Sequence, residues 1–165
     1  MAETINSLYF DDVEFDKAIR KLVKSRIAED DVYDLFDKEV RLLSIDAQND
    51  ITKAKLPAIY LQVVNPTPYE LTQEDIQIQA HTRFTVEINV YTSGKNQKVN
   101  NMKLCNILIR LMQSNGYIGT HDDYYVRGLK LQENTEVSSL VADTTRRVLR
   151  FSGVCDNRTN LIYSI

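Results

Sequence analysis

Between Arg83 and Gln113 the pattern of apolar and polar positions changes from a period of two to a helical period. In the first part of this stretch, apolar residues alternate with polar ones, which is the pattern of a half-buried strand. The apolar set is Phe84, Val86, Ile88 and Val90. The opposite face carries Arg83, Thr85, Glu87, Asn89 and Tyr91. We expect this strand to lie centrally in a sheet that has one face in the core.

After a break at residues 92–94, apolar residues recur at spacings of three and four, which predicts an amphipathic helix over 96–115. Its predicted buried stripe consists of Val99, Met102, Cys105, Leu108, Ile109 and Met112. The helix should end at the pair Asn115-Gly116, because both residues tolerate left-handed backbone geometry. This strand and helix form the predicted scaffold of the protein, and they contain no catalytic motif.

The remaining elements follow from similar patterns. Helices are predicted at 11–26 and 30–43, so that residues 1–45 form an N-terminal helical arm and residues 46–165 form an α+β domain. Strands are predicted at 57–64, at 124–131 with a weak point or bulge at Gly128, and at 145–156. Residues 66–82 and 132–142 should be long connections, and residues 161–165 a short terminal strand.

Together these elements predict an α+β fold: a largely antiparallel sheet of about four strands, with one long helix packed on one face, plus the N-terminal helices. The second face of the sheet mixes apolar side chains with charged ones. Such a face is typical of a surface between subunits or around a lumen. Candidate interface residues on this face and in the 66–82 connection are Tyr69, Ile76, Ile78, Arg83, Glu87, Tyr91, Arg146 and Arg150.

Composition narrows the functional classes. The chain has 165 residues, 43% of them hydrophobic, and a formal net charge of −3, which fits a globular domain and gives no reason to expect a general nucleic-acid binder. No segment has the length of a membrane span or the pattern of a signal peptide, so we expect a protein made in a cytoplasm that does not contact a membrane. Cys105 and Cys155 are expected to be reduced core residues.

Few residues suggest chemistry. The sequence contains neither a glycine-rich phosphate loop nor a nucleophile elbow, and its two histidines stand apart, so we predict no enzyme activity, cofactor or metal. Arg146, Arg147 and Arg150 could bind phosphate, as in a small nucleic-acid-binding module. Alternatively, Glu87 pairs with Arg146 or Arg150 across neighbouring strands.

Several stretches resemble the tail terminator (tail completion) proteins of tailed bacteriophages, the minor proteins of the head–tail junction. The strand from Phe84 to Tyr91 is similar to an alternating strand of that family that ends in an aromatic residue. A helix ending in Asn115-Gly116-Tyr117 and an arginine-bearing last strand over 145–156 continue the likeness, and the strand starting at Pro57 fits the family's first strand. The resemblance covers roughly residues 57–165, whereas the N-terminal helices are longer than the family's usual leading helix.

The resemblance implies a homo-oligomeric ring, generally hexameric, that caps the completed tail tube and stops its polymerisation. The ring would contact the tail-tube protein and the head–tail connector, and phage DNA would pass through it without being read. The protein would then be located in the virion, after assembly in the host bacterial cytoplasm. A head-closure or adaptor protein of the neck is an alternative within the same particle.

Overall fold

The computed structural model describes residues 12–44, 46, 56–68, 81–114, 125–138 and 142–156. The helices are α2 (Asp12–Ile27), α3 (Asp30–Phe36) and α5 (Gln97–Ser114). The strands are β1 (Arg41–Leu43), β2 (Ala58–Pro68), β3 (His81–Ser93), β4 (Tyr125–Val137) and β5 (Thr144–Asp156). The predicted terminal strand at 161–165 lies outside the described residues.

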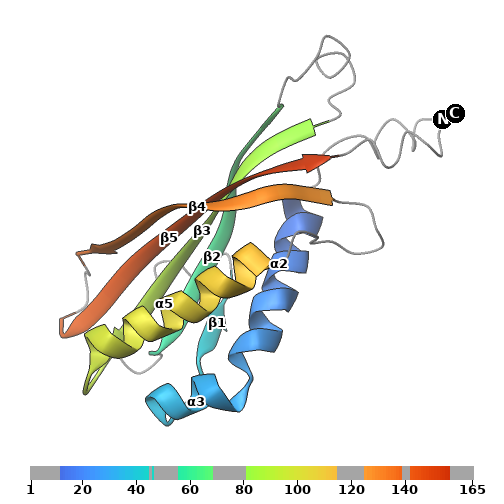
Figure 1. Cartoon of the computed structure of the whole chain (residues 1–165). Coiled ribbons are helices and arrows are strands. Elements are labelled where there is room, and N and C mark those ends of the chain that lie inside the picture. The colour runs from blue at the N-terminus through green and yellow to red at the C-terminus, as the bar shows by residue number, and fades with distance from the viewer. Residues whose placement is uncertain are drawn as a thin grey trace, which may run out of the picture.

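The strands form one sheet in the order β1-β2-β3-β5-β4 (Figure 1). Strand β1 runs parallel to β2, and the other three pairs are antiparallel. In the centre, Ile88 of β3 lies opposite Leu61 of β2 and Leu149 of β5. The predicted α+β fold with a largely antiparallel sheet is therefore confirmed, with the short edge strand β1 added to the strands that the sequence predicted.

Helices α2 and α5 pack on the same face of the sheet (Figure 1). Phe15, Ile19 and Val23 of α2 are completely buried in the cluster that contains the alternating residues of β3. The rings of Phe15 and Phe84 meet edge to face, with centroids 4.6 Å apart. The first N-terminal helix is thus packed into the main core, while the division of the chain at residue 45 stays a prediction.

The second predicted helix is wrong beyond Phe36. Asp37 adopts a left-handed conformation (φ 53°), and its N–H donates to the carbonyl of Tyr33 at 2.9 Å, which ends α3. The following residues turn into β1, where Leu42 lies opposite Ile59. The helical spacing of apolar residues continues past Phe36 in the sequence. The left-handed backbone of Asp37 nevertheless ends the helix, and a strand follows.

The predicted connection at 132–142 is also wrong, because β4 continues to Val137 and pairs with β5 over its whole length. This part of β4 is polar because it lies at the edge of the sheet, where charged side chains are favoured. The register shifts between Arg127 and Lys130, which confirms the irregularity predicted at Gly128. A second shift lies between Leu131 and Glu133.

The side of α5 that is buried differs from the predicted one. Val99 and Met102 are 52% and 51% exposed, whereas Asn101 and Leu104 are buried. The amide of Asn101 explains this orientation, because it donates to the Val90 carbonyl at 3.0 Å and lies 3.1 Å from the Thr92 hydroxyl. Its hydrogen bonds compensate its burial, so a polar residue occupies the side of the helix that faces the sheet.

Arg20 connects α2 to the edge of the sheet. Its guanidinium forms an ion pair with Asp16 at 2.7 Å. The same group donates to the carbonyl of Leu43 in β1 at 2.7 Å and to the carbonyl of Leu61 in β2. One side chain of α2 therefore binds the main chains of two neighbouring strands.

Candidate functional site

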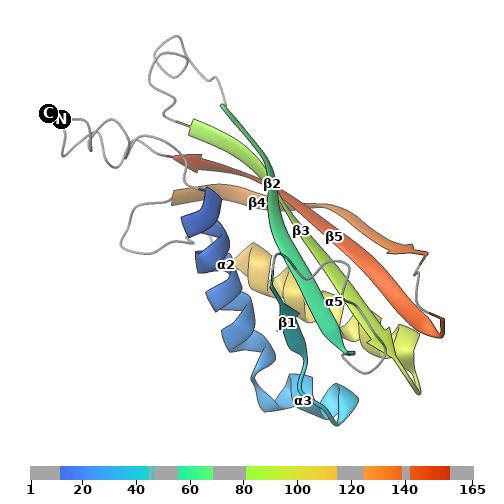
Figure 2. The same ribbon diagram turned by 180° about the vertical axis from the view of Figure 1, so that it is seen from behind.

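The face of the sheet opposite to α2 and α5 carries most of the candidate residues, and we call it the outer face. No helix of the described ranges lies across it (Figure 2). The strand register places the outward residues in rows that cross the sheet from β2 to β4. The two central rows contain Gln62, Glu87, Arg150 and Glu133, and Tyr60, Asn89, Val148 and Thr135.

Arg150 is the centre of the charged row. Its Nε donates to Glu87 Oε2 at 3.0 Å, and its Nη1 donates to Glu133 Oε2 at 2.6 Å. The carboxylate of Glu87 also accepts a hydrogen bond from Asn89 Nδ2 at 3.0 Å. One cation thus joins carboxylates of β3 and β4, so three neighbouring strands are cross-linked by side chains. The prediction that Glu87 pairs with an arginine across the strands is confirmed for Arg150.

The environment of Glu87 favours its charged form. Burial raises the pKa of this carboxyl, but hydrogen bonds from Asn89 and Arg150 and the charge of Arg150 outweigh burial, so the net pKa lies below its usual value. The same contacts raise the pKa of Arg150. Glu87 and Arg150 are therefore both ionised at neutral pH.

Arg146 occupies a different environment on the same face. Its Nε and Nη2 donate to Asn89 Oδ1 at 3.0 and 2.8 Å, and its guanidinium carbon lies 5.7 Å from the centroid of the Tyr91 ring. Tyr60 and Tyr91 are 3% and 8% exposed, and burial raises the pKa of both hydroxyls. Asn89 and Tyr91 are neutral, so they position the charge of Arg146 without compensating it.

The structure brings together four of the predicted interface residues: Glu87, Tyr91, Arg146 and Arg150. Arg83 lies on the same face, opposite Val154, further along β3. The other three candidates, which are Tyr69, Ile76 and Ile78, lie outside the described residues. A role for any of these residues in an interface stays a prediction.

The three arginines of β5 do not form one cationic patch. Arg147 lies on the helix-covered side of the sheet, opposite Val90, and its Nη1 donates to Asn134 Oδ1 at 2.9 Å. Arg150 is already paired with two carboxylates. The partners described for Arg146 and Arg147 are neutral, but these two side chains lie on opposite sides of the sheet, which is a weak basis for binding a phosphate backbone.

Sequence reasoning missed two members of this network, Asn89 and Glu133. Asn89 is 1% exposed and connects Glu87 to Arg146. A polar residue in the middle of a central strand was the available signal. Glu133 was assigned to a connection, and its role becomes visible only when β4 is known to continue past it.

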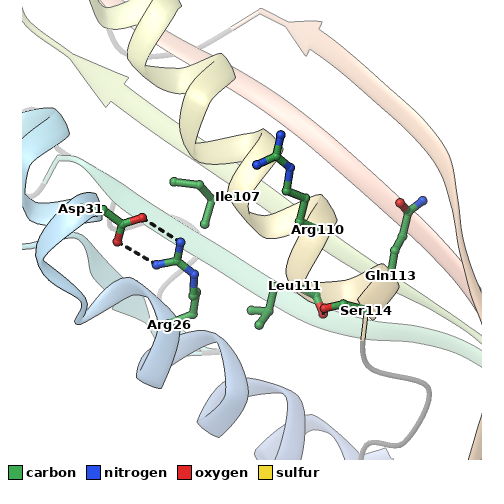
Figure 3. A pocket seen from close by; sticks show the side chains of 7 residues that line it. All are labelled: Arg26, Asp31, Ile107, Arg110, Leu111, Gln113 and Ser114. Atoms are coloured by element: carbon green, nitrogen blue, oxygen red, sulfur yellow. Dashed lines mark hydrogen bonds and ion pairs between the residues drawn. The ribbon is translucent and has the colours of Figure 1, made fainter.

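A shallow, open groove lies on the helical side, between the α2–α3 corner and the second half of α5. It has a volume of about 690 Å³ and is lined by Arg26, Asp31, Ile107, Arg110, Leu111, Gln113 and Ser114. Arg26 forms two hydrogen bonds with Asp31, at 2.9 and 2.8 Å, while Ile107 and Leu111 lie on the side of α5 that faces this pair (Figure 3). The groove holds no arrangement of nucleophile and base.

Within the part of the chain that the structure describes, no three His, Cys, Asp or Glu side chains are placed to share a metal ion. Over the same residues, none of the helices combines the length and apolar character needed to cross a bilayer. The outer face carries the cross-strand network of Glu87, Arg150 and Glu133, while Tyr60, Asn89 and Tyr91 beside it are buried.

No protein-family model matches the sequence, and no curated protein matches it. Among solved structures, the chain is similar to a protein in the virion of a native gene transfer agent particle, with a TM-score of 0.54 and 14% sequence identity. The match covers 85% of this chain and 96% of that one. A second solved chain is 13% identical with a TM-score of 0.49, covering 94% and 96%. The first likeness shows a shared fold over most of both chains.

Proposed function

We propose that the protein is a structural component of a phage-like virion. The fold likeness to a protein of a gene transfer agent virion supports this, and so does an outer face that is organised for contact rather than for catalysis. Because the shared fold spans nearly the whole of that virion protein, the likeness concerns its complete domain and not an isolated motif.

Within the virion, we assign the protein the role of a tail terminator: a ring, hexameric by analogy with the family it resembles, that caps the completed tail tube and stops its growth. One side of the ring would contact the tail-tube protein and the other the head–tail connector. The observation that carries this proposal is the cross-linked outer face. Arginine is enriched at protein interfaces, and here Arg150, whose side chain is 46% exposed, is held in place by carboxylates of two neighbouring strands.

The charge of the outer face fits a channel through which DNA slides. The described side chains of this face include four cations, Arg83, Lys130, Arg146 and Arg150, and two carboxylates, Glu87 and Glu133. Strong binding to DNA requires many cations that neutralise phosphates. An excess of only two cations would let the phage DNA pass through the ring without holding it.

The test combines assembly state with function. We expect light scattering and negative-stain images of the purified chain to show rings, and we expect the chain to limit the length of tubes when it is added to polymerising tail-tube protein. The double variant Arg83→Ala/Arg150→Ala, at two exposed positions of the outer face, should weaken one of these activities while the fold is retained. The matched control is Lys24→Ala, an exposed position of α2 outside the outer face. A chain that remains monomeric, and that leaves tube length unchanged, would refute the proposal.

A further inference from the structure

The outward face of α5 combines exposed apolar side chains with positive charge only. The 18 residues of α5 include Lys98, Lys103 and Arg110 but no acidic residue. Val99 and Met102, one helical turn apart, are about half exposed between these cations. Interleaved apolar and cationic side chains on a helix favour contact with an acidic protein surface that also carries an apolar residue.

The cations of this face have few partners within the chain. Lys98 lies 3.7 Å from Glu136, and both side chains are well exposed. Lys103 and Arg110 form no ion pair within the described residues. The face therefore has two positive charges and two apolar side chains available to a partner, in a chain whose net charge is negative.

The same chain carries a surface of the opposite kind. From Glu29 to Asp37, around α3, there are five acidic residues and no basic one, and Tyr33 is 47% exposed among them. Arg26 pairs with Glu29 at 2.6 Å and with Asp31 at 2.8 Å. This leaves Asp30, Asp34 and Asp37, which form no ion pair within the described residues.

Within the described residues, the acidic surface around α3 forms no ion pair with the basic face of α5. Helix α3 contacts the side of α5 that carries Asn100, whose side-chain amide donates to the Leu35 carbonyl at 3.0 Å. Asn100 lies on the flank of α5, so the outward residues Val99 and Lys103 remain exposed beside this contact. Both surfaces therefore stay exposed within the single chain.

We infer that the acidic surface around Tyr33 of one copy docks on the outward face of α5 of the next copy. Asp30 and Asp34 would face Lys103 and Arg110, and Tyr33 would pack against Val99 and Met102. A head-to-tail ring requires two unlike, complementary surfaces on every subunit, and this chain provides such a pair. The inference rests on the proposed ring, and it places a contact between copies on the helical side, separate from the outer face.

Charge reversal tests the contact. In the first variant, Lys103→Glu/Arg110→Glu, both surfaces are acidic; in the second, Asp30→Lys/Asp34→Lys, both are basic. Each variant alone should assemble at least about tenfold more weakly than the wild type, because like charges then face each other. An equimolar mixture should assemble again, because each acidic surface meets a basic one. The mixed assemblies should alternate the two variants and contain an even number of subunits. Lys21→Glu/Lys24→Glu, which changes the net charge by the same amount as the first variant at exposed positions of α2, is the control.

The outcomes separate this contact from the ring itself. If the wild type is monomeric at every concentration, both proposals are wrong. If rings form and neither reversal weakens them, or if the mixture does not recover, only the α3–α5 contact is wrong. If the mixture gives pairs of subunits and no larger species, the contact is right and the ring is wrong.

Discussion

Removing Arg150 should expose how the outer face is held together. In the Arg150→Ala variant, Glu87, whose side chain is 14% exposed in the native chain, loses its cation. Glu133 loses the same partner at 32% exposure. A carboxylate that cannot reach water depends more on its partner, so the two contacts of Arg150 should differ in strength.

The solvent exposure of the three side chains determines how much each ion pair should contribute to stability. Exposed ion pairs contribute about 0.2–1 kcal/mol to stability, whereas hydrogen bonds to charged groups away from water contribute about 1.5–3 kcal/mol. Arg150 is itself 46% exposed, so solvent screens both contacts. We therefore expect a coupling free energy of about 1–2 kcal/mol between Arg150 and Glu87, and about 0.5 kcal/mol between Arg150 and Glu133. The order is opposite to that of the distances, 3.0 and 2.6 Å.

Two double-mutant cycles measure these values. The variants Arg150→Ala, Glu87→Ala and Glu133→Ala, with the two double variants, are unfolded in urea at low salt and the free energies of unfolding compared. If the Glu133 coupling equals or exceeds the Glu87 coupling, then burial does not decide the strength of these contacts. A Glu87 coupling close to zero would show that this contact does not contribute to the stability of the fold.

Three further outcomes are expected. The lowered pKa of Glu87 makes its contribution to the unfolding free energy complete above the pKa of the unfolded carboxyl and lost as the pH falls through the folded value, so Glu87→Gln should flatten the acid side of a stability–pH profile. Gly153→Ala should destabilise the protein by about 1–3 kcal/mol in thermal or urea unfolding, since its Cβ would lie 2.8 Å from Cζ of the buried Phe84. In a Cys155→Ser background, Cys105 should react with a thiol reagent at pH 8 only after unfolding, because burial raises its pKa to about 12; rapid reaction of the native chain would contradict this.

The strands of the central sheet could be read from the sequence because each has one face in the core. In β3, burial imposes the alternation from Phe84 to Val90, and the register across to β5 then places Glu87 beside Arg150. This is why much of the outer face was predicted. The pairing of one particular arginine depends on the register, which alternation alone does not determine.

The helices and edges were harder to predict, for local reasons. On α5, hydrogen bonds to the Val90 carbonyl and the Thr92 hydroxyl make Asn101 a good core residue, and the apolar Val99 and Met102 are left outside. After α3, one residue in the left-handed region, Asp37, converted a continuing helical pattern into a turn and a strand. Hydrophobic periodicity predicts neither the burial of a hydrogen-bonded asparagine nor a left-handed residue that ends a helix.

The side chain of Arg20 has a consequence for the order in which the protein opens. Strand β1 has only three residues, and its carbonyl at Leu43 is bound by a helix that precedes it in the chain. Fraying of α2 would withdraw the guanidinium from Leu43 and Leu61 together, and peeling of β1 would leave that charge half-buried beside Asp16. The first helix and the sheet edge should therefore open as one cooperative unit, and their amide protons should exchange with the same free energy of opening.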